Sequence, residues 1–375
     1  WPEKIIGMIK RKNIRLPIIS LGFLMGILKQ KNIAAKYYDG TLPEIEPEVA
    51  LIYGSIVDYK NELAVAKELK KKFPKAKVGF IGPFASTKPE LFEAAEFVIV
   101  GDFEYFFLKG FTAVSQLTGK VLVTEKIDLD QLPRPELEGF PISEYCYTPA
   151  ITSKPFFSMQ ASKGCPYSCA YYCVYGDFQG PKIRARSPKN VVGDMRSLKE
   201  QHRIQGFQFR DPVFGLQPGY IEAFCKELKK QKLDVEWGIE TRADLLDEQK
   251  IKLMFEVGLR NLNLGIETID PDVAKQNKRL LITEQHQEHI VRYSEKLGVK
   301  VCGFYVFALE GDTKETMELT LRYAKKLNTF LARFAVCTPY PGTRLFDDLK
   351  KEGRLLTEDY EQYTQFDPVI RHENF

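Results

Sequence analysis

The chain has 375 residues, of which 44% are hydrophobic and 28% are charged, and its formal net charge is +4. These values are those of an ordinary globular protein, and so small a net charge does not indicate a nucleic-acid-binding surface. No apolar run reaches the roughly 20 residues that a transmembrane helix requires. The length favours two domains.

The first domain, residues 1–125, alternates short apolar runs with amphipathic segments. We expect helices at residues 16–30, 60–73, 88–95 and 103–117, and strands at residues 34–38, 49–53, 77–81 and 97–100. This alternation predicts a parallel sheet with right-handed crossovers, whose first strand would precede Trp1. Each strand ends near a glycine, which lets backbone approach a ligand at the carboxyl edge of the sheet. Taken singly, each glycine is explained equally well by a tight turn.

Residues 126–152 form a linker, because prolines interrupt regular structure there. The alternation restarts in a second domain, residues 153–345, and residues 346–375 are a C-terminal extension. We expect strands at residues 156–160, 206–210, 235–240, 259–265, 301–308 and 331–338, with helices at 190–202, 220–230, 247–257, 284–297 and 315–327. Eight βα units close a full barrel, so six predict a partial (β/α)6 barrel, open on one side.

Three cysteines, Cys165, Cys169 and Cys173, follow the first strand of this barrel. Three thiolates on one short loop can bind three irons of a 4Fe–4S cluster, which leaves the fourth iron open for a substrate or cofactor. The other four cysteines are scattered singly, unlike the dense and even-numbered pattern of a disulfide framework. We therefore favour an iron–sulfur cluster at this loop.

Zinc is the alternative for the same loop. It normally takes four ligands in paired spacings, and none of the four histidines lies near the cysteines in sequence. His286 and His289 form an HxxH pair, but the helix expected there is polar, and a solvated face explains them better. The ligand preferences of the two metals favour the cluster.

The ordered motifs resemble those of radical S-adenosylmethionine (SAM) enzymes that carry an N-terminal cobalamin-binding domain. In that family an aromatic residue precedes the last cysteine, as Tyr172 does here. The remaining matches are a basic stretch and Ser-Pro at 182–188, FxDxxF at Phe209, Asp211 and Phe214, a GIES-like run at 265–268, Asn277-Lys278, a glycine–glutamate pattern at Gly303, Tyr305 and Glu310, and PxPGT at 339–343.

The resemblance implies roles for particular residues. Cys165, Cys169 and Cys173 would ligate the cluster, and the amino and carboxylate groups of SAM would chelate its open iron. Backbone near Tyr172 would meet the adenine. Asp211 would lie near the methionine amine, and Arg242 and Glu267 near the ribose or carboxylate, because a zwitterion needs both acceptors and donors. The alternative to SAM binding is a structural role for either acid. For Glu267 this role would be an ion pair with a barrel arginine.

Two positions depart from the family pattern. The usual cysteine spacing is CxxxCxxC, whereas this chain has the longer CxxxCxxxC, with the additional residue within 170–172. Phe307 replaces a glycine of the fifth-strand pattern, which could narrow the space around SAM. The first departure concerns the geometry of the loop more than the presence of the cluster.

The N-terminal pattern resembles the flavodoxin-like, Rossmann-type cobalamin-binding domain of that family. No histidine precedes His202, which excludes a histidine ligand to cobalt from this domain. The residues that match the cobalamin-binding positions are Gly54, Ser55, Val57, Gly82, Pro83 and Gly101. The resemblance implies cobalamin bound with its nucleotide tail in the sheet edge and no histidine on cobalt. The alternative is a degenerate domain that no longer binds cobalamin.

The resemblance implies an enzyme that reductively cleaves SAM to a 5′-deoxyadenosyl radical and methylates an unactivated carbon with the help of cobalamin. One alternative is a radical SAM enzyme of another type (decarboxylation, ring formation or C–C coupling), in which cobalamin is absent or does not donate methyl. An alternative of another class is a non-catalytic iron–sulfur redox sensor. A methylthiotransferase is disfavoured, because that reaction needs a second cluster and the N-terminal domain has no cysteine before Cys146.

The expected partners are an electron donor such as flavodoxin or ferredoxin and a substrate that is a small molecule, lipid or peptide; no nucleic acid is expected. Free thiols and a labile cluster favour a reducing, cytoplasmic setting.

Overall fold

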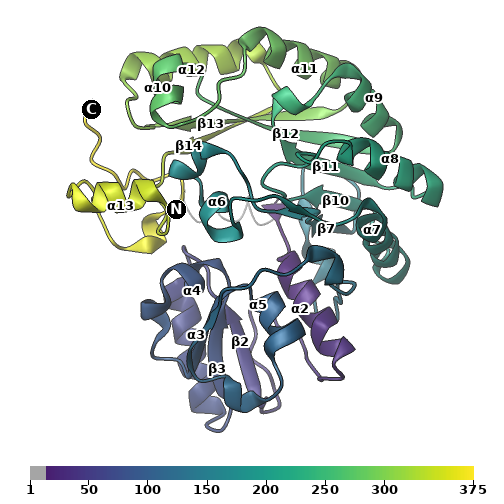
Figure 1. The fold of residues 1–375 in the computed structure, drawn as a ribbon, viewed down its shortest axis with the longest axis vertical. Coiled ribbons are helices and arrows are strands. Elements are labelled where there is room, and N and C mark those ends of the chain that lie inside the picture. Colours follow the sequence, from purple (N-terminus) through teal and green to yellow (C-terminus); the bar gives the residue numbers. More distant parts are fainter. Residues whose placement is uncertain (1–13) are drawn as a thin grey trace.

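The computed structural model describes residues 14–375 as two parallel α/β units (Figure 1). The N-terminal unit contains a four-stranded parallel sheet in the order β2-β3-β4-β5. Its elements are β2 (Val49–Tyr53), β3 (Lys77–Ile81), β4 (Phe97–Gly101), β5 (Gly119–Val123), α2 (Ile19–Gln30), α3 (Tyr59–Lys72), α4 (Pro83–Thr87) and α5 (Phe103–Tyr105).

The second unit contains a six-stranded parallel sheet in the order β14-β13-β12-β11-β10-β7, which confirms the expected six βα steps. Its strands are β7 (Phe156–Met159), β10 (Gly206–Phe209), β11 (Glu236–Thr241), β12 (Leu259–Glu267), β13 (Lys300–Phe307) and β14 (Leu331–Val336). Its helices are α6 (Val174–Gln179), α7 (Pro188–His202), α8 (Tyr220–Gln231), α9 (Glu248–Glu256), α10 (Pro271–Gln276), α11 (Glu284–Lys296) and α12 (Lys314–Leu327). The curled sheet and its outer helices form the upper part of Figure 1.

Three expected elements of the N-terminal unit are wrong. The helix expected at 88–95 lies earlier in the chain, as α4, and only a 3-10 turn at Pro89–Phe92 falls within the expected range. Residues 34–38 form no strand, because Tyr37 instead stacks on Phe140 of the linker, with 3.8 Å between ring centroids. The helix expected at 103–117 is limited to α5 and one π-helical turn ending at Gly110. Phe106 and Phe107 are buried in that turn, and β5 follows as a strand that the pattern did not predict.

The linker adds a small strand of its own. Strand β6 (Cys146–Tyr147) pairs antiparallel with β1 (Ile14–Arg15). Farther along, the carboxylate of Glu236 at the start of β11 accepts hydrogen bonds from the backbone of Thr152 and Ser153. The linker therefore packs against the barrel at the amino end of its strands.

The two faces of the barrel sheet differ in chemistry, as the period-2 alternation of strands requires. The outer face packs aromatic rings under the helices: Phe209 and Trp237 lie 5.5 Å and 5.2 Å from the ring of Phe224 on α8. Gln208, Gly238 and Asn261 are aligned across β10, β11 and β12 on the opposite, inner face. The core therefore lies between sheet and helices, and the inner face is left to polar groups.

The C-terminal extension joins the two units. After α13 (Arg344–Lys351), the buried ring of Tyr360 packs 6.3 Å from Tyr59 of α3 and 5.5 Å from Phe84 of α4. Lys60 forms an ion pair with Asp359 at 2.7 Å. The extension therefore anchors the N-terminal unit to the barrel rather than trailing from it.

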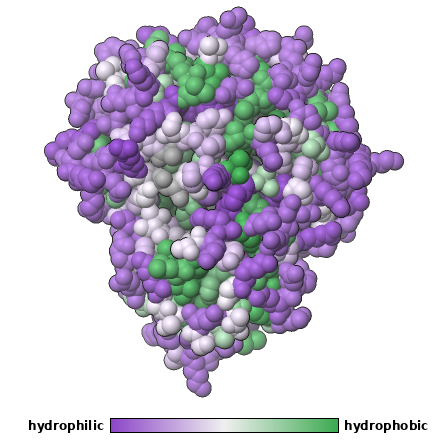
Figure 2. Space-filling view, in the orientation of Figure 1, coloured by the Kyte–Doolittle hydropathy of each residue, from purple (hydrophilic) through white to green (hydrophobic). Residues whose placement is uncertain are grey.

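In the view of Figure 2, apolar side chains form separate patches, one of them over the N-terminal unit, within a largely hydrophilic surface. Across residues 14–375, no helix is both long enough and apolar enough to cross a membrane.

The anchoring role of the extension predicts a loss of stability for Tyr360→Ala. Removing a buried aromatic side chain costs about 3 kcal/mol through lost burial and the cavity left behind. Leu356→Ala, at a leucine that is 53% exposed, is the matched control and should change the free energy of unfolding by less than about 0.5 kcal/mol. Chemical denaturation measures both values, and equal effects would contradict the anchoring role.

Candidate active site

The cysteine loop is closed at its base by a two-residue ladder. Strand β8 (Ser162–Lys163) pairs antiparallel with β9 (Arg184–Ala185). Gly164 follows with φ of +89°, and a Cβ there would lie 2.1 Å from the carbonyl oxygen of Lys182. Only glycine fits such a crossing. The loop thus leaves and re-enters the barrel at one fixed point.

The three thiols of this loop are partly buried and not disulfide-bonded. Burial raises the pKa of each, that of Cys173 to about 12, and the negative charge of neighbouring thiolates raises the pKa values of Cys169 and Cys173 further. The guanidinium groups of Arg242 and Arg279 oppose this by lowering the pKa values of Cys165 and Cys169. Two cations therefore act on Cys165 and Cys169 of this loop.

This donor set fits an iron–sulfur cluster better than a single metal ion. Among the described residues, no group of three or more His, Cys, Asp or Glu side chains is placed to hold one ion. In a 4Fe–4S cluster each thiolate binds a different iron, so the three sulfurs need not converge on one point. Nearby guanidinium groups offset the negative charge that three thiolates bring together.

Glu267, at the end of β12, lies beside the cysteine loop. Its φ is +67°, an uncommon left-handed conformation for this residue, at a register shift between Gly265 and Glu267. Its carboxylate faces Arg279 at 3.6 Å, and Arg279 also donates to the carbonyl of Gly265 and interacts with Tyr172. The alternative for Glu267, an ion pair with an arginine, is thus present, although the arginine follows α10 rather than a barrel strand.

Arg242, which follows β11, reaches the same loop. Its guanidinium lies 4.4 Å from the centroid of the Tyr167 ring and 2.9 Å from the carboxylate of Asp244. Its side chain is 5% exposed. The structure therefore brings three of the expected SAM-binding residues, Tyr172, Arg242 and Glu267, to the cysteines.

Asp211 occupies a different position, beneath the loop. Its carboxylate accepts hydrogen bonds from the backbone nitrogen of Ala161 at 3.1 Å and from the hydroxyl of Ser162 at 2.6 Å. Burial raises its pKa to about 7. These contacts fix the end of β7 where the cysteine loop begins, and the role of Asp211 beside SAM stays a prediction.

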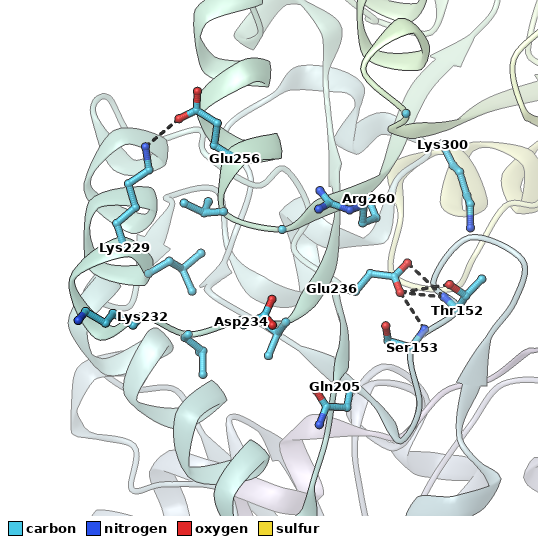
Figure 3. A pocket seen from close by; sticks show the side chains of 16 residues that line it. Thr152, Ser153, Gln205, Lys229, Lys232, Asp234, Glu236, Glu256, Arg260 and Lys300 are labelled. Atoms are coloured by element: carbon cyan, nitrogen blue, oxygen red, sulfur yellow. Dashed lines mark hydrogen bonds and ion pairs between the residues drawn. The ribbon is translucent and has the colours of Figure 1, made fainter.

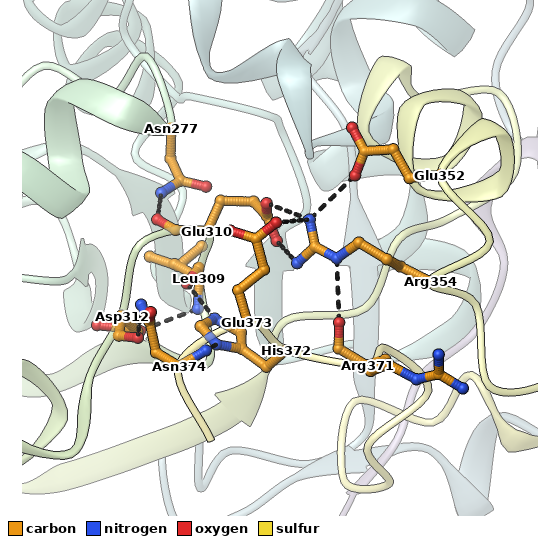
Figure 4. A network of polar contacts seen from close by, with 10 residues as sticks. All are labelled: Asn277, Leu309, Glu310, Asp312, Glu352, Arg354, Arg371, His372, Glu373 and Asn374. Carbon is orange, nitrogen blue, oxygen red and sulfur yellow. Dashed lines mark hydrogen bonds and ion pairs between the residues drawn. The ribbon is translucent and has the colours of Figure 1, made fainter.

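Glu310 after β13, also a matched motif residue, is held by the C-terminal extension (Figure 4). Arg354 donates to both carboxylate oxygens of Glu310, at 2.9 and 3.0 Å. His372 bonds the carbonyl of Leu309, and Asn374 donates to that of Asp312. This network ties the strand end to the tail, and sequence reasoning missed it because Arg354 lies outside every motif.

The inner face of the barrel carries polar residues that the motif search also missed. Arg210 pairs with Glu240, and Asn263 donates to the hydroxyl of Tyr147 at 2.9 Å. Across the barrel, the guanidinium of Arg333 lies 5.7 Å from the Phe304 ring. Alternation along each strand is the signal that could have found them, since polar residues at every second position of a buried strand must line a polar space.

The residues expected to bind cobalamin gather at the carboxyl edge of the N-terminal sheet. The backbone nitrogen of Gly54 donates to the carbonyl of Ile81, and that of Gly101 donates to the hydroxyl of Ser86, which itself bonds Gly82. Pro83 begins α4 at the same edge, and Val57 is 45% exposed. The hydroxyl of Ser55 already donates to Glu62 at 2.6 Å, so an incoming ligand would meet it as an acceptor.

A pocket of about 600 Å³ lies at the opposite end of the barrel (Figure 3). It is lined by residues at the starts of β11, β12 and β13, including Glu236, Arg260 and Lys300. These three already bond the linker or nearby backbone. We assign the chemistry to the carboxyl ends of the strands, where the cysteines lie, because parallel barrels place their sites there.

The half-barrel and its three-cysteine loop define a radical SAM domain. Residues 159–324 match the family model of the Radical SAM superfamily. The chain therefore carries a radical SAM domain, which implies a 4Fe–4S cluster and SAM.

Relatives extend the likeness beyond this domain. An uncharacterized methyltransferase of Pyrococcus horikoshii is 29% identical over 66% of this chain and 53% of its own length. The anaerobic magnesium-protoporphyrin IX monomethyl ester cyclase of Rubrivivax gelatinosus is 28% identical over 68% of this chain and 45% of its own length. The chain thus spans about half the length of these curated relatives.

Two solved structures have the same fold. The radical SAM methyltransferase TsrM from Kitasatospora setae, solved with cobalamin and a 4Fe–4S cluster, has a TM-score of 0.71 at 16% identity, covering 90% of this chain and 72% of TsrM. The cobalamin-dependent enzyme OxsB has a TM-score of 0.66 at 16% identity, covering 96% of this chain and 56% of OxsB. Both units of this chain therefore adopt the fold of cobalamin-dependent radical SAM enzymes.

The donor set predicts that Cys165→Ala, Cys169→Ala and Cys173→Ala each remove the cluster. Two thiolates leave two irons without protein ligands, so anaerobically reconstituted variants should lose most iron and the broad visible absorbance. Cys225→Ala is the control, because Cys225 is a buried residue of α8 and lies outside the cysteine loop. Full iron content in any of the three loop variants would remove that cysteine from the ligand set.

The raised pKa of Asp211 predicts a pH dependence of stability. The folded chain binds this proton up to about pH 7, whereas an ordinary aspartate releases it near 3.8, so this group lowers stability as pH rises through that window. Relative to wild type, Asp211→Asn should become more stable from pH 4 to pH 7, by more than about 1 kcal/mol. Asp247→Asn should change little over the same range, because the pKa of Asp247 is lowered below 3.8 and the group therefore titrates below this window; denaturation at several pH values measures both.

Proposed function

We propose that this chain is a cobalamin-dependent radical SAM methyltransferase acting on an unactivated carbon. The observation that carries the proposal is the convergence of Cys165, Cys169 and Cys173 with Glu267 and Arg279 at the carboxyl edge of a six-stranded half-barrel. The relatives named as methyltransferases and the TsrM-like fold support it.

The cluster and SAM, when bound, supply a 5′-deoxyadenosyl radical that abstracts a substrate hydrogen. The chain's part is to bind and orient. The carboxylate of Glu267 can accept from an ammonium group, while the guanidinium of Arg279 or Arg242 can donate to a carboxylate, which matches both ends of the methionine moiety. Partly buried Tyr172, which interacts with Arg279, lies on the loop side of this group of residues.

The N-terminal edge supports cobalamin as the second cofactor. Gly54, Gly82 and Gly101 bring backbone without side chains to one edge, which suits a large flat ligand. Cobalt would have no histidine ligand from the described part of this unit, since the first histidine of the chain is His202. A substrate placed between this edge and the barrel would reach both cofactors.

The inner wall of the barrel supports a substrate with a polar group. Arg210, Glu240, Asn263 and Arg333 lie on this face, and the guanidinium of Arg333 lies over the Phe304 ring. An external one-electron donor such as flavodoxin or ferredoxin completes the reaction, and the free thiols suit a reducing cytoplasm.

Product analysis with SAM labelled on its methyl group tests the proposal. The expected result is labelled methyl in the product together with 5′-deoxyadenosine, from protein whose visible spectrum shows cobalamin beside the cluster. Formation of 5′-deoxyadenosine with an unlabelled product would instead assign another radical SAM reaction. Absence of 5′-deoxyadenosine with SAM and dithionite, from protein that retains its cluster, would favour a redox sensor.

A further inference from the structure

Two buried charges join the cysteine loop to the N-terminal sheet. The Nζ atom of Lys163 lies 2.7 Å from the carboxylate of Glu104, and the two side chains are 12% and 3% exposed. Glu104 stands in α5, three residues after β4 ends at Gly101. Lys163 is the last residue of β8, two positions before Cys165. The contact therefore runs from the proposed cobalamin edge to the base of the cluster loop.

A second pair of charges flanks the first on the same side. Arg184 faces Lys163 across the β8–β9 ladder, and its guanidinium lies 3.9 Å from the carboxylate of Asp102. The Asp102 carboxylate also accepts from the backbone of Tyr105 and Ile127. Arg184 donates to the carbonyl of Ile127 at 2.6 Å. Both ends of the cysteine loop thus carry a cation that faces an acid from the end of β4.

The Lys163–Glu104 and Arg184–Asp102 contacts form a joint between the cysteine loop and the N-terminal unit. Burial makes this joint resist displacement of either partner. A buried charge is tolerated only when it is paired and hydrogen-bonded, and removing one partner leaves the other uncompensated. The loop base cannot slide along the N-terminal edge without leaving Glu104 or Lys163 unpaired. Ion pairs on the surface of the same unit, such as Lys70 with Glu96, allow such movement because solvent replaces the partner.

We propose that Lys163 and Glu104, assisted by Arg184 and Asp102, are positioning residues that fix the cluster loop against the ligand edge of the N-terminal sheet. They set the separation between the cluster and a ligand bound at Gly101 and its neighbours. The inference rests on the proposed function for the identity of that ligand, but the joint itself concerns only the chain's own residues.

Hydrogen exchange of the purified holoprotein tests the joint. Lys163→Met and the milder, isosteric Glu104→Gln should speed the exchange of amides in residues 164–183 at least tenfold, with α7 unchanged. The charge-swapped double variant, Lys163→Glu with Glu104→Lys, should partly restore the slow hydrogen exchange of these amides. Glu96→Gln removes a partly exposed pair and should leave the loop as in wild type.

Electron paramagnetic resonance gives the second measurement. In protein that holds both cofactors, the spin–spin interaction between cob(II)alamin and the reduced cluster reports their separation. It should weaken or broaden in Glu104→Gln and stay unchanged in Glu96→Gln. A structural role alone would lower the melting temperature without changing loop exchange or this interaction.

The outcomes separate the joint from the proposed function. Wild-type loop exchange and an unchanged cluster spectrum in both Lys163→Met and Glu104→Gln would overturn the joint, whatever reaction the chain performs. If wild-type protein binds no cobalamin, the methyltransferase proposal fails, and loop exchange together with the cluster's own spectrum still decides the joint.

Discussion

The need to pair each buried charge at the carboxyl ends of the strands governs the arrangement of this protein. An ionised group taken out of water is costly unless an opposite charge or several hydrogen bonds accompany it. Glu267 meets Arg279, Glu310 meets Arg354 and Glu104 meets Lys163. In each pair, the acid lies at or just after the end of a strand, and its partner comes from another segment of the chain. Pairing charges at the site therefore also determines how loops, tail and N-terminal unit pack around the barrel.

The same requirement explains why the cysteine loop can be long and irregular. Between Gly164 and Lys182 the chain has only short helical turns, yet its base is fixed by the β8–β9 ladder, by the contacts of Asp211 and by Lys163. A loop held at its base can accommodate one more residue between its cysteines without moving the strand that precedes it. The longer CxxxCxxxC spacing is thus absorbed within the loop, at residues 170–172.

Much of this could be predicted from the sequence, and the limits have physical causes. The barrel strands follow a strong local pattern of apolar residues, so they were predicted close to their observed positions. The spacing of the three cysteines favoured an iron–sulfur cluster without any long-range information. The segment at 34–38 was wrong because Tyr37 packs on Phe140, a partner about a hundred residues away. Arg279 and Arg354 were missed for the same reason: a long-range ion pair leaves no periodic signal in either partner.

The glycines of the N-terminal edge show how a functional pattern can have a packing explanation. A Cβ at Gly101 would lie 2.1 Å from the carbonyl oxygen of Val123, and one at Gly82 would lie 3.1 Å from the Tyr53 ring. The fold thus requires these glycines for packing, and the same lack of side chains leaves backbone at this edge that a ligand could approach. Glu104 differs, because an apolar residue could fill its buried position without needing a partner. A buried acid that meets the base of the cysteine loop fits the proposed positioning role of Glu104 and Lys163 better than a role in stability alone.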